Sequence, residues 1–279
     1  MSNISLGIYT PEVACKNAAE LFQRVRGFGF SEVQFDFLSV MDEEMPLHIP
    51  DALALECRAE AEKNGVAMTV VNGTYNMAHP DPAVREDGMN RFDEICRATK
   101  LMGGRMVSLN TGTRNPDNMW VPHPDNNTPE AWHDMNVCME RAILAAEKYD
   151  VLLGLETEAS NTCNAPEKVR RLIQDMQSDR LRVIMDCANL FSAGTAHRSM
   201  ARDVIQKGFD LLGEYVFVAH GKDILEGDGI SFTYTGNGIV DFPFFMEQLE
   251  KIGYQGGMII HGTKHESEIG PSVDFMRRL

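Results

Sequence analysis

The sequence predicts an α/β fold, a single (β/α)8 barrel that spans residues 1–279 as one domain. Three observations predict it: eight short apolar segments recur along the chain, amphipathic helical patterns separate them, and polar side chains follow several of them. The length of 279 residues suits such barrels, which typically contain about 250 residues. A doubly wound open sheet is the main competing fold, but no GxGxxG follows the first apolar segment and no linker divides the chain.

The eight apolar segments are rich in β-branched or large residues. They begin at residues 4, 32, 66, 105, 151, 182, 215 and 257. Their apolar residues run continuously rather than alternating with polar ones, which is typical of strands that are buried on both faces. They therefore predict the strands of a parallel sheet.

Helical patterns lie between these segments. Residues 16–30 place Ala18, Leu21 and Phe22 on one stripe, and residues 51–65 end on Asn-Gly, a common helix stop. Similar patterns cover residues 85–104, 128–150, 165–177, 200–213 and 241–254. Their alternation with the apolar segments favours strand–helix units.

Composition and charge exclude several classes of function. The net charge is −15 and no basic run is present, which argues against a nucleic acid partner. The N-terminal residues lack the features of a signal peptide, and no apolar run approaches the ~20 residues of a membrane-spanning helix. These features predict a cytoplasmic protein with no membrane partner. Six scattered cysteines predict reduced thiols, and a homo-oligomer stays open.

Polar side chains gather where the predicted strands end. In a (β/α)8 barrel the residues that leave the carboxyl ends of the strands face one shared site. The ionisable residues at these positions are His79, Arg114, Glu156, Glu158, Asp186, His220, Lys222, Asp223 and His261. The sequence therefore predicts a site at that end of the barrel.

Three of these residues suit a divalent metal. Glu156, Asp186 and His220 would supply two carboxylates and one imidazole, a ligand set that accepts Mn²⁺, Mg²⁺, Co²⁺ or Zn²⁺. Each has an ordinary alternative when taken alone: a solvated loop carboxylate, a helix cap and a hydrogen-bonded core histidine. Their convergence on one barrel mouth favours one bound metal ion.

Five stretches carry a resemblance to a known family. They are "GTYNMAHPD" (73–81), "TGTRNPDNMWVPHPDNNTPEAW" (111–132), "LETEASNT" (155–162), "MDCANLF" (185–191) and "AHGKD" (219–223). With them, the chain resembles the xylose isomerase-like TIM-barrel superfamily over essentially its whole length, in particular the sugar phosphate isomerase/epimerase branch. The superfamily also includes ketose 3-epimerases, inosose dehydratases and endonuclease IV.

The resemblance implies roles for the strand-end residues. Glu156, Asp186 and His220 correspond to the family's metal ligands. The fourth ligand is commonly a Glu after the last strand, where this chain has His261, a residue that can still ligate. The resemblance to endonuclease IV is set aside, because Asn189 stands where that enzyme has a histidine after the Asp.

The function implied is a metal-dependent isomerase or epimerase of a keto-sugar or sugar phosphate that acts through an enediolate. A lyase or dehydratase that uses the same metal site is the alternative, and a non-catalytic sugar-binding scaffold is a third possibility. Glu158, or Glu156 in a dual role, would move the proton, while Lys222 would polarise a substrate oxygen and His79 would relay protons or bind hydroxyls. The other residues assigned to substrate binding are Asn76, Arg114, Trp120, His123 and Asp223.

Overall fold

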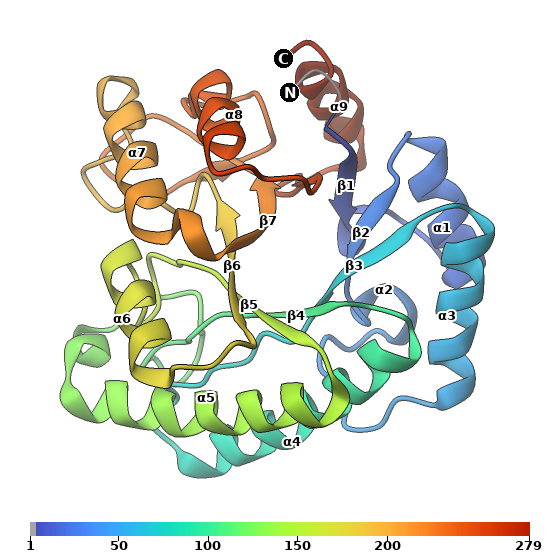
Figure 1. Ribbon diagram of the computed structural model, residues 1–279, viewed down its shortest axis with the longest axis horizontal. Helices are drawn as coiled ribbons and strands as arrows, with labels where there is room; N and C mark the ends of the chain where they lie inside the picture. Colours follow the sequence, from blue (N-terminus) through green and yellow to red (C-terminus); the bar gives the residue numbers. More distant parts are fainter. Residues whose placement is uncertain (1–3) are drawn as a thin grey trace.

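Eight parallel strands close into a barrel in the computed structural model, which describes residues 4–279. Figure 1 shows the strands at the centre of a ring of helices. The barrel strands are β1 (Leu6–Tyr9), β2 (Glu32–Phe35), β3 (Ala67–Asn72), β4 (Met106–Leu109), β5 (Leu152–Leu155), β6 (Leu181–Asp186), β7 (Val216–Gly221) and β10 (Met258–Ile260). They are neighbours in chain order, and β10 closes the barrel by pairing with β1.

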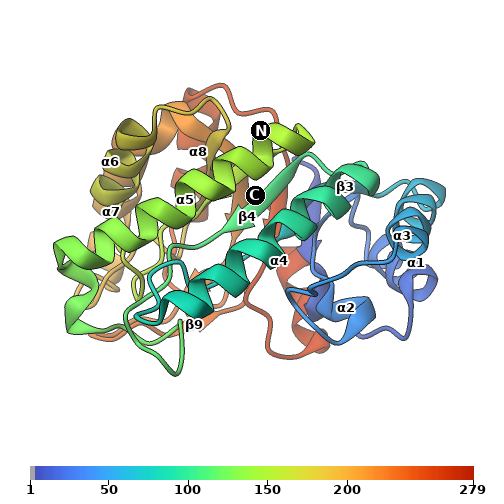
Figure 2. The same cartoon turned by 90° about the horizontal axis from the view of Figure 1, so that it is seen from below.

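The helices surround the barrel. They are α1 (Ala18–Gly27), α2 (Leu38–Met41), α3 (Asp51–Lys63), α4 (Pro82–Leu101), α5 (Pro129–Tyr149), α6 (Pro166–Met176), α7 (Ala201–Leu212), α8 (Phe242–Lys251) and α9 (Ile269–Met276). Figure 2 shows the two longest, α4 and α5, lying side by side along one flank of the molecule. Several begin at a side-chain cap: Thr128, for example, accepts a hydrogen bond from the backbone N–H of Ala131 at the start of α5.

The predicted (β/α)8 barrel is confirmed, and its eight predicted strands lie within two residues of the observed starts. The sequence did not predict the short helix α2, the last helix α9 or a two-stranded antiparallel sheet of β8 (Asp223–Ile224) and β9 (Phe232–Thr233). Elements this short carry too few residues to show a period. The small sheet matters because it follows directly on β7 and forms part of the barrel mouth.

The strands are apolar along their length because each of their two faces packs into a different apolar layer. Most buried side chains lie in one large core, while a small cluster is formed by one residue from each of five barrel strands: Val70, Met106, Ile184, Val218 and Ile259. Successive strand residues point to opposite faces, so this cluster fills the barrel interior while their neighbours pack against helices. The polar site can therefore occupy only the mouth above that apolar filling.

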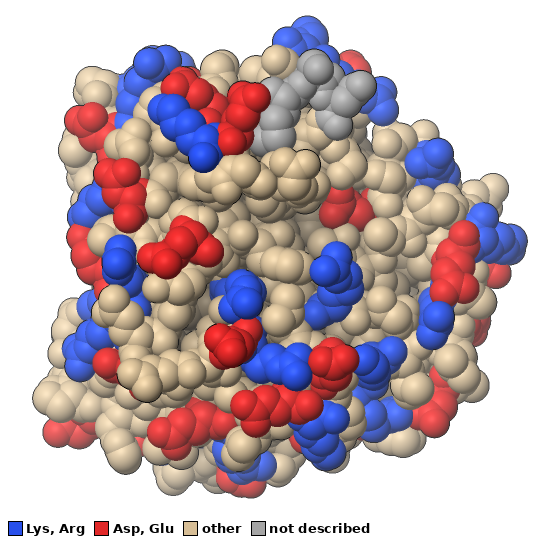
Figure 3. Space-filling view, in the orientation of Figure 1, with Lys and Arg blue, Asp and Glu red and all other residues tan. Residues whose placement is uncertain are grey.

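Acidic and basic side chains are interspersed on the face drawn in Figure 3, and neither kind forms one large patch there. Many charged side chains of the described residues form surface ion pairs, such as that of Arg97 with Asp51 and Glu94. Within residues 4–279, no helix has the length and apolar character that a membrane span requires.

Candidate active site

A cavity of about 910 Å³ opens at the carboxyl ends of the barrel strands. Its walls come from successive strand ends, among them Tyr9 at the end of β1, Asn72 at the end of β3 and His261 just after β10. Two other cavities have similar volumes, but one lies at the opposite end of the barrel and the other outside it, beside the start of α5. The mouth cavity is the one that holds the candidate chemistry.

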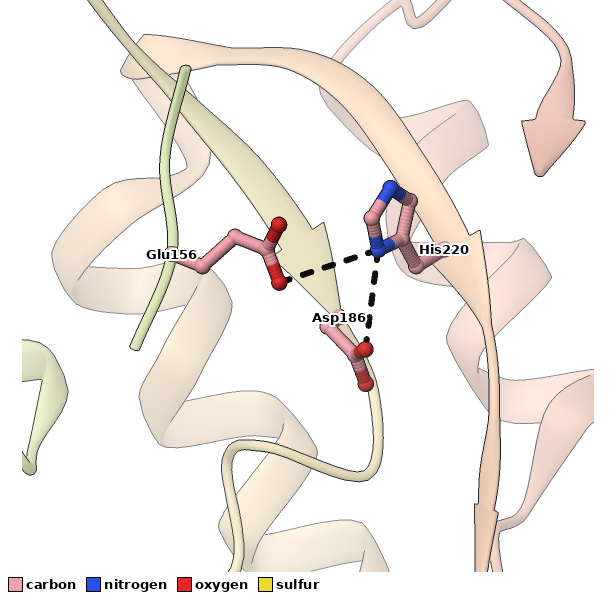
Figure 4. Close-up of side chains that lie close together, drawn as sticks. All are labelled: Glu156, Asp186 and His220. Carbon is pink, nitrogen blue, oxygen red and sulfur yellow. Dashed lines mark ion pairs between the residues drawn. The ribbon is translucent and has the colours of Figure 1, made fainter. Parts of the chain in front are cut away.

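Three buried side chains converge beneath this cavity. Glu156 follows β5, Asp186 ends β6 and His220 lies in β7, where the strand register pairs it with Asp186. His220 Nδ1 lies 3.6 Å from Asp186 Oδ2 and 3.8 Å from Glu156 Oε2 (Figure 4). One ligand atom from each residue lies within 4.8 Å of the other two, so this group could hold a metal ion.

Unpaired polar atoms show that the three residues fit such an ion. Both ring nitrogens of His220 are buried without a hydrogen-bond partner in the part of the chain that the structure describes. Oδ2 of Asp186 is also buried and accepts no hydrogen bond there, but it forms an ion pair with Lys222. Asp186 Oδ1, by contrast, accepts hydrogen bonds from the backbone N–H groups of Ala188 and Asn189. A buried polar atom without a partner is costly. One oxygen thus orients the carboxylate, while the other faces Lys222 and His220 and could also ligate a metal cation.

Lys222 is the cation next to this group. Its Nζ lies 3.1 Å from Asp186 Oδ2, donates a 2.7 Å hydrogen bond to Asn189 Oδ1 and lies 4.0 Å from the centre of the Phe232 ring. Burial opposes its charge, but Asp186, Glu158 and Glu156 outweigh burial and raise its pKa. Lys222 is therefore an ammonium ion, a hydrogen-bond donor and not a base.

The two carboxyl groups of this cluster, those of Glu156 and Asp186, have opposite pKa shifts. Burial raises the pKa of Glu156, and the attraction of His220 and Lys222 only partly offsets this. For Asp186, burial acts in the same direction, but Lys222 and His220 outweigh it and hold the pKa well below its usual range. Asp186 is thus the permanent negative charge of the site, while Glu156 is more readily protonated.

Glu158 also lines the cavity, two residues after Glu156. Its Oε1 accepts hydrogen bonds from the backbone N–H and the hydroxyl of Ser160. The backbone of Glu158 is bonded at both sides within a compact turn, through Cys163 and Asn161. This turn holds the carboxylate at the cavity wall.

His261 is oriented by a residue far away in the sequence. Its Nδ1 lies 3.0 Å from Oε1 of Glu12, which also accepts a hydrogen bond from the backbone N–H of Gly262. A carboxylate accepts hydrogen bonds, so Nδ1 carries the hydrogen and Nε2 is the nitrogen available to a ligand. His261 lines the cavity with its ring 5.8 Å from that of His220, but it lies outside the compact group of three.

A second polar network occupies the other side of the mouth. The Tyr9 hydroxyl and the Asn72 side-chain amide both donate to Oδ2 of Asp36, at 2.6 and 2.7 Å. Ser108 donates in turn to Asn72 Oδ1. Tyr9 packs edge-on against His261, which links this network to the side of the cavity that holds Glu156 and His220.

Four of the predicted substrate-binding residues lie away from this cavity or serve the backbone. Arg114 pairs with Asp134 and, like His123, lines the outer cavity beside α5. Asn76 accepts a hydrogen bond from the backbone N–H of Thr113. Asp223 accepts from four backbone N–H groups, those of Ile224, Gly236, Gly238 and Val240.

His79 and Trp120 differ in their placement. His79 is buried, its Nε2 is 3.1 Å from the carbonyl oxygen of Pro116, and its Nδ1 accepts from the backbone N–H of Asp81. Both its ring nitrogens thus serve the loop. Trp120 lines the mouth cavity and is about half exposed.

The sequence prediction omitted Tyr9, Glu12, Gln34, Asp36 and Asn110. Tyr9 ends β1 and lies near the end of the first apolar segment, and Asp36 falls within the second apolar segment. The strand-end rule applied to the first two strands would therefore have pointed to both. Glu12 carried no comparable signal, because its partner His261 lies 249 residues further along the chain.

Comparisons with known proteins extend this description. A family model described as xylose isomerase-like TIM barrel matches residues 22–279. No curated protein matches the sequence. Among solved structures the chain is similar to a 3-keto-D-glucoside 4-epimerase from E. coli, with 17% identity and a TM-score of 0.75, covering 99% of this chain and 100% of that one.

Two further structures are similar. One is a D-tagatose 3-epimerase-like protein, with 17% identity and a TM-score of 0.76, covering 99% of this chain and 96% of that chain. The other is D-psicose 3-epimerase from Clostridium cellulolyticum H10, with 16% identity and a TM-score of 0.69, covering 99% of each chain. At these identities the likeness shows the fold alone.

The hydrogen bonds of Asp223 lead to a test of its role. In Asp223→Ala four backbone N–H groups lose their acceptor, so the free energy of unfolding should fall by at least about 3 kcal/mol in urea denaturation. Asp228→Ala, an exposed residue of the same loop, is the control and should change it by no more than about 0.5 kcal/mol. Unchanged stability with loss of sugar binding would instead favour the predicted substrate contact.

Proposed function

The chain belongs to the family of xylose isomerase-like TIM barrels, and on this premise we propose that it is a divalent-metal-dependent isomerase or epimerase of a keto-sugar that acts through an enediolate. The observation that carries the proposal is the buried group of Glu156, Asp186 and His220 at the base of the mouth cavity, in which neither ring nitrogen of His220 has a hydrogen-bond partner among the described residues. That three similar structures are named as sugar epimerases or as epimerase-like supports the substrate class.

The proposed ligands are Glu156, Asp186 and His220, with Nε2 of His261 as the fourth. The ion is Mn²⁺, Mg²⁺, Co²⁺ or Zn²⁺, since carboxylate and imidazole ligands suit all four. When bound, it supplies Lewis-acid stabilisation of the negative charge that develops on substrate oxygens.

The proposed proton acceptor is Glu158. A keto-sugar must lose a proton from the carbon next to its carbonyl, and the carboxylate of Glu158 faces the same cavity as the ligand group. As the carboxylate takes the proton, the C–H electron pair forms a double bond to the carbonyl carbon and the carbonyl π pair moves onto its oxygen, which gives the enediolate. Protonation of the opposite face by a second acid gives an epimer, whereas return of the proton by Glu158 to the neighbouring carbon gives an isomer.

Lys222 has a supporting role in this proposal. Its ammonium ion lies at the cavity wall, held by Asp186 and Asn189, and carries donors suited to a substrate oxygen. Such a fixed donor favours the more negative transition state over the neutral ketose. Phe232 beside it removes water from one side of the ammonium group.

Metal binding is the first test. The wild-type protein should bind about one Mn²⁺ per chain in isothermal titration calorimetry, and saturation at 100 times the Kd should stabilise the fold by about 2.7 kcal/mol. In His220→Ala the affinity should fall at least about 100-fold, because a ligand nitrogen is lost. His48→Ala removes a largely exposed histidine and should bind Mn²⁺ as the wild type does. Equal affinity in all three proteins would contradict the ligand assignment.

The raised pKa of Glu156 predicts how metal binding depends on pH. The cation binds the deprotonated carboxylate, and burial makes that carboxylate protonate at a higher pH than an exposed Glu. Mn²⁺ affinity should therefore be greatest near about pH 8 and should decrease as the pH is lowered toward about 5, with proton uptake when the ion is released. Affinity that rises on acidification would contradict this shift.

Proton transfer is tested with Glu158→Gln. The Mn²⁺-loaded wild type in D₂O should introduce deuterium next to the carbonyl of D-fructose, D-tagatose or D-psicose, as measured by NMR. Glu158→Gln should slow this exchange by about 10²–10⁴-fold, because the amide cannot accept the proton. Its Mn²⁺ affinity should remain that of the wild type.

Product mass distinguishes the reaction classes in the same samples. An isomer or epimer keeps the mass of the substrate apart from the added deuterium. Loss of water from the product would contradict the isomerase and establish the dehydratase alternative, and unchanged exchange in Glu158→Gln would assign the base to another residue.

A further inference from the structure

Two carboxamides in the mouth cavity have unpaired oxygens. Gln34 lies in β2 and Asn110 directly follows β4, so both stand on the side of the barrel away from β6 and β7. Each side chain lines the cavity and each residue is only 5% exposed. Gln34 Oε1 and Asn110 Oδ1 are buried without a hydrogen-bond partner among the described residues. Asn72, between them on β3, already bonds to Asp36 and Ser108.

The chemistry of these two oxygens indicates what they bind. A buried amide oxygen without a donor is costly, and large polar groups in a cavity wall are retained where a ligand satisfies them. A side-chain amide offers one acceptor and two donors, and a hydroxyl group is both donor and acceptor. A substrate hydroxyl therefore meets the needs of Gln34 and Asn110, whereas a group that only accepts does not.

The charge around the cavity disfavours a phosphorylated ligand. Among residues 4–279, no arginine lines it, and its carboxylates Glu44, Glu156 and Glu158 face a single ammonium ion, that of Lys222. Lys222 is already paired with Asp186 and hydrogen-bonded to Asn189. Away from the proposed metal ion, a phosphate dianion would lie among carboxylates, and no other lysine or arginine lines the cavity among residues 4–279 to compensate for its charge.

Backbone donors that could bind a phosphate are also occupied. In barrels of this kind the loops after the last two strands commonly provide such donors. Here the N–H groups of Gly236 and Gly238 donate to Asp223, and that of Gly262 donates to Glu12. Internal carboxylates thus take the positions on these glycine turns that a phosphate would need.

We propose that Gln34 and Asn110 form a recognition subsite for the hydroxyl groups of an uncharged polyol, and that the substrate enters without a phosphate group. The subsite binds the part of the substrate remote from the reacting carbons, which lie against Glu156 and Glu158. This inference rests on the proposed function, because it uses the same cavity, and it adds the substrate class.

The test measures binding to the Mn²⁺-loaded protein by isothermal titration calorimetry. The probes are D-fructose, D-tagatose, D-psicose, myo-inositol and methyl α-D-glucoside, with D-fructose 6-phosphate and inorganic phosphate as charged counterparts. At least one uncharged polyol should bind, and D-fructose 6-phosphate should bind at least about 10-fold more weakly than that polyol.

Variants then locate the subsite. Gln34→Leu and Asn110→Leu should each weaken binding of that polyol by about 10-fold or more, since each removes a hydrogen-bonding partner. Their Mn²⁺ affinity should match that of the wild type, which shows that the barrel mouth is intact. Gln255→Leu, at an exposed position near the opposite end of the barrel, is the matched control and should bind the polyol normally.

Several outcomes would overturn the subsite. They are tighter binding of D-fructose 6-phosphate or inorganic phosphate than of every polyol, wild-type polyol affinity in both leucine variants, and no binding of any uncharged probe. The wild-type comparison of charged and uncharged probes does not depend on the folding of a variant. Failure of the proposed function would give a different result. A polyol that binds but does not exchange deuterium would support the subsite and would contradict the isomerase.

Discussion

The negative charge of Asp186, buried at the barrel mouth, sets the conditions for the groups around it. An isolated carboxylate cannot remain ionised in such a place, because burial penalises its charge. Two backbone N–H groups after β6 bind one of its oxygens, and Lys222 and His220 face the other. The Asp186 carboxylate thus contacts the loop after β6 and the end of β7, and it holds Lys222, which in turn bonds to the side chain of Asn189. Lys222 compensates for it only in part, since Glu156 adds a second carboxylate nearby.

The barrel mouth divides into two halves of different chemistry. The ends of β5, β6 and β7 carry the ionisable group of Glu156, Asp186 and His220. The ends of β2, β3 and β4 carry amides and hydroxyls, with Asp36 as the acceptor that orders Tyr9 and Asn72. A ligand in the cavity therefore meets the cluster of ionisable groups on one side and mainly amides and hydroxyls, with the carboxylate of Glu44, on the other. Such a division suits a substrate that reacts at one end and is recognised at the other.

Two further carboxylates serve the backbone rather than the ligand. Asp223 binds the N–H groups of a glycine-rich turn, and Glu12 joins the loop after β1 to the loop after β10 across the closure of the barrel. Each is nearly inaccessible to solvent and has more than one partner. They explain how loops with several glycines hold a defined shape at the mouth. They also show why an acidic residue beside a strand end is not by itself a ligand for substrate.

The sequence by itself determined the barrel and the place of the site along the chain. Continuous apolar runs predict buried parallel strands, and the polar residues directly after them had to gather at one end, so Glu156, Asp186, His220 and Lys222 could be named from local pattern alone. Family membership, which the matched family model shows, was likewise visible in short motifs. The metal roles of Glu156, Asp186 and His220 stay predictions, as does the substrate contact of Lys222.

Only the tertiary structure decided which polar side chains share the cavity. His79, Arg114 and His123 follow strands as Glu156 does, yet the long loops after β3 and β4 turn them toward backbone carbonyls, Asp134 and the outer cavity. Gln34 and Asn110 looked like ordinary neutral residues in the sequence. Their unpaired oxygens exist because the closed barrel buries them beside a space that no other side chain of the described residues fills. The sequence could not predict these pairings for a physical reason. A strand is recognised from the order of neighbouring residues, whereas a hydrogen bond across the barrel mouth depends on contacts between residues that are far apart in the chain.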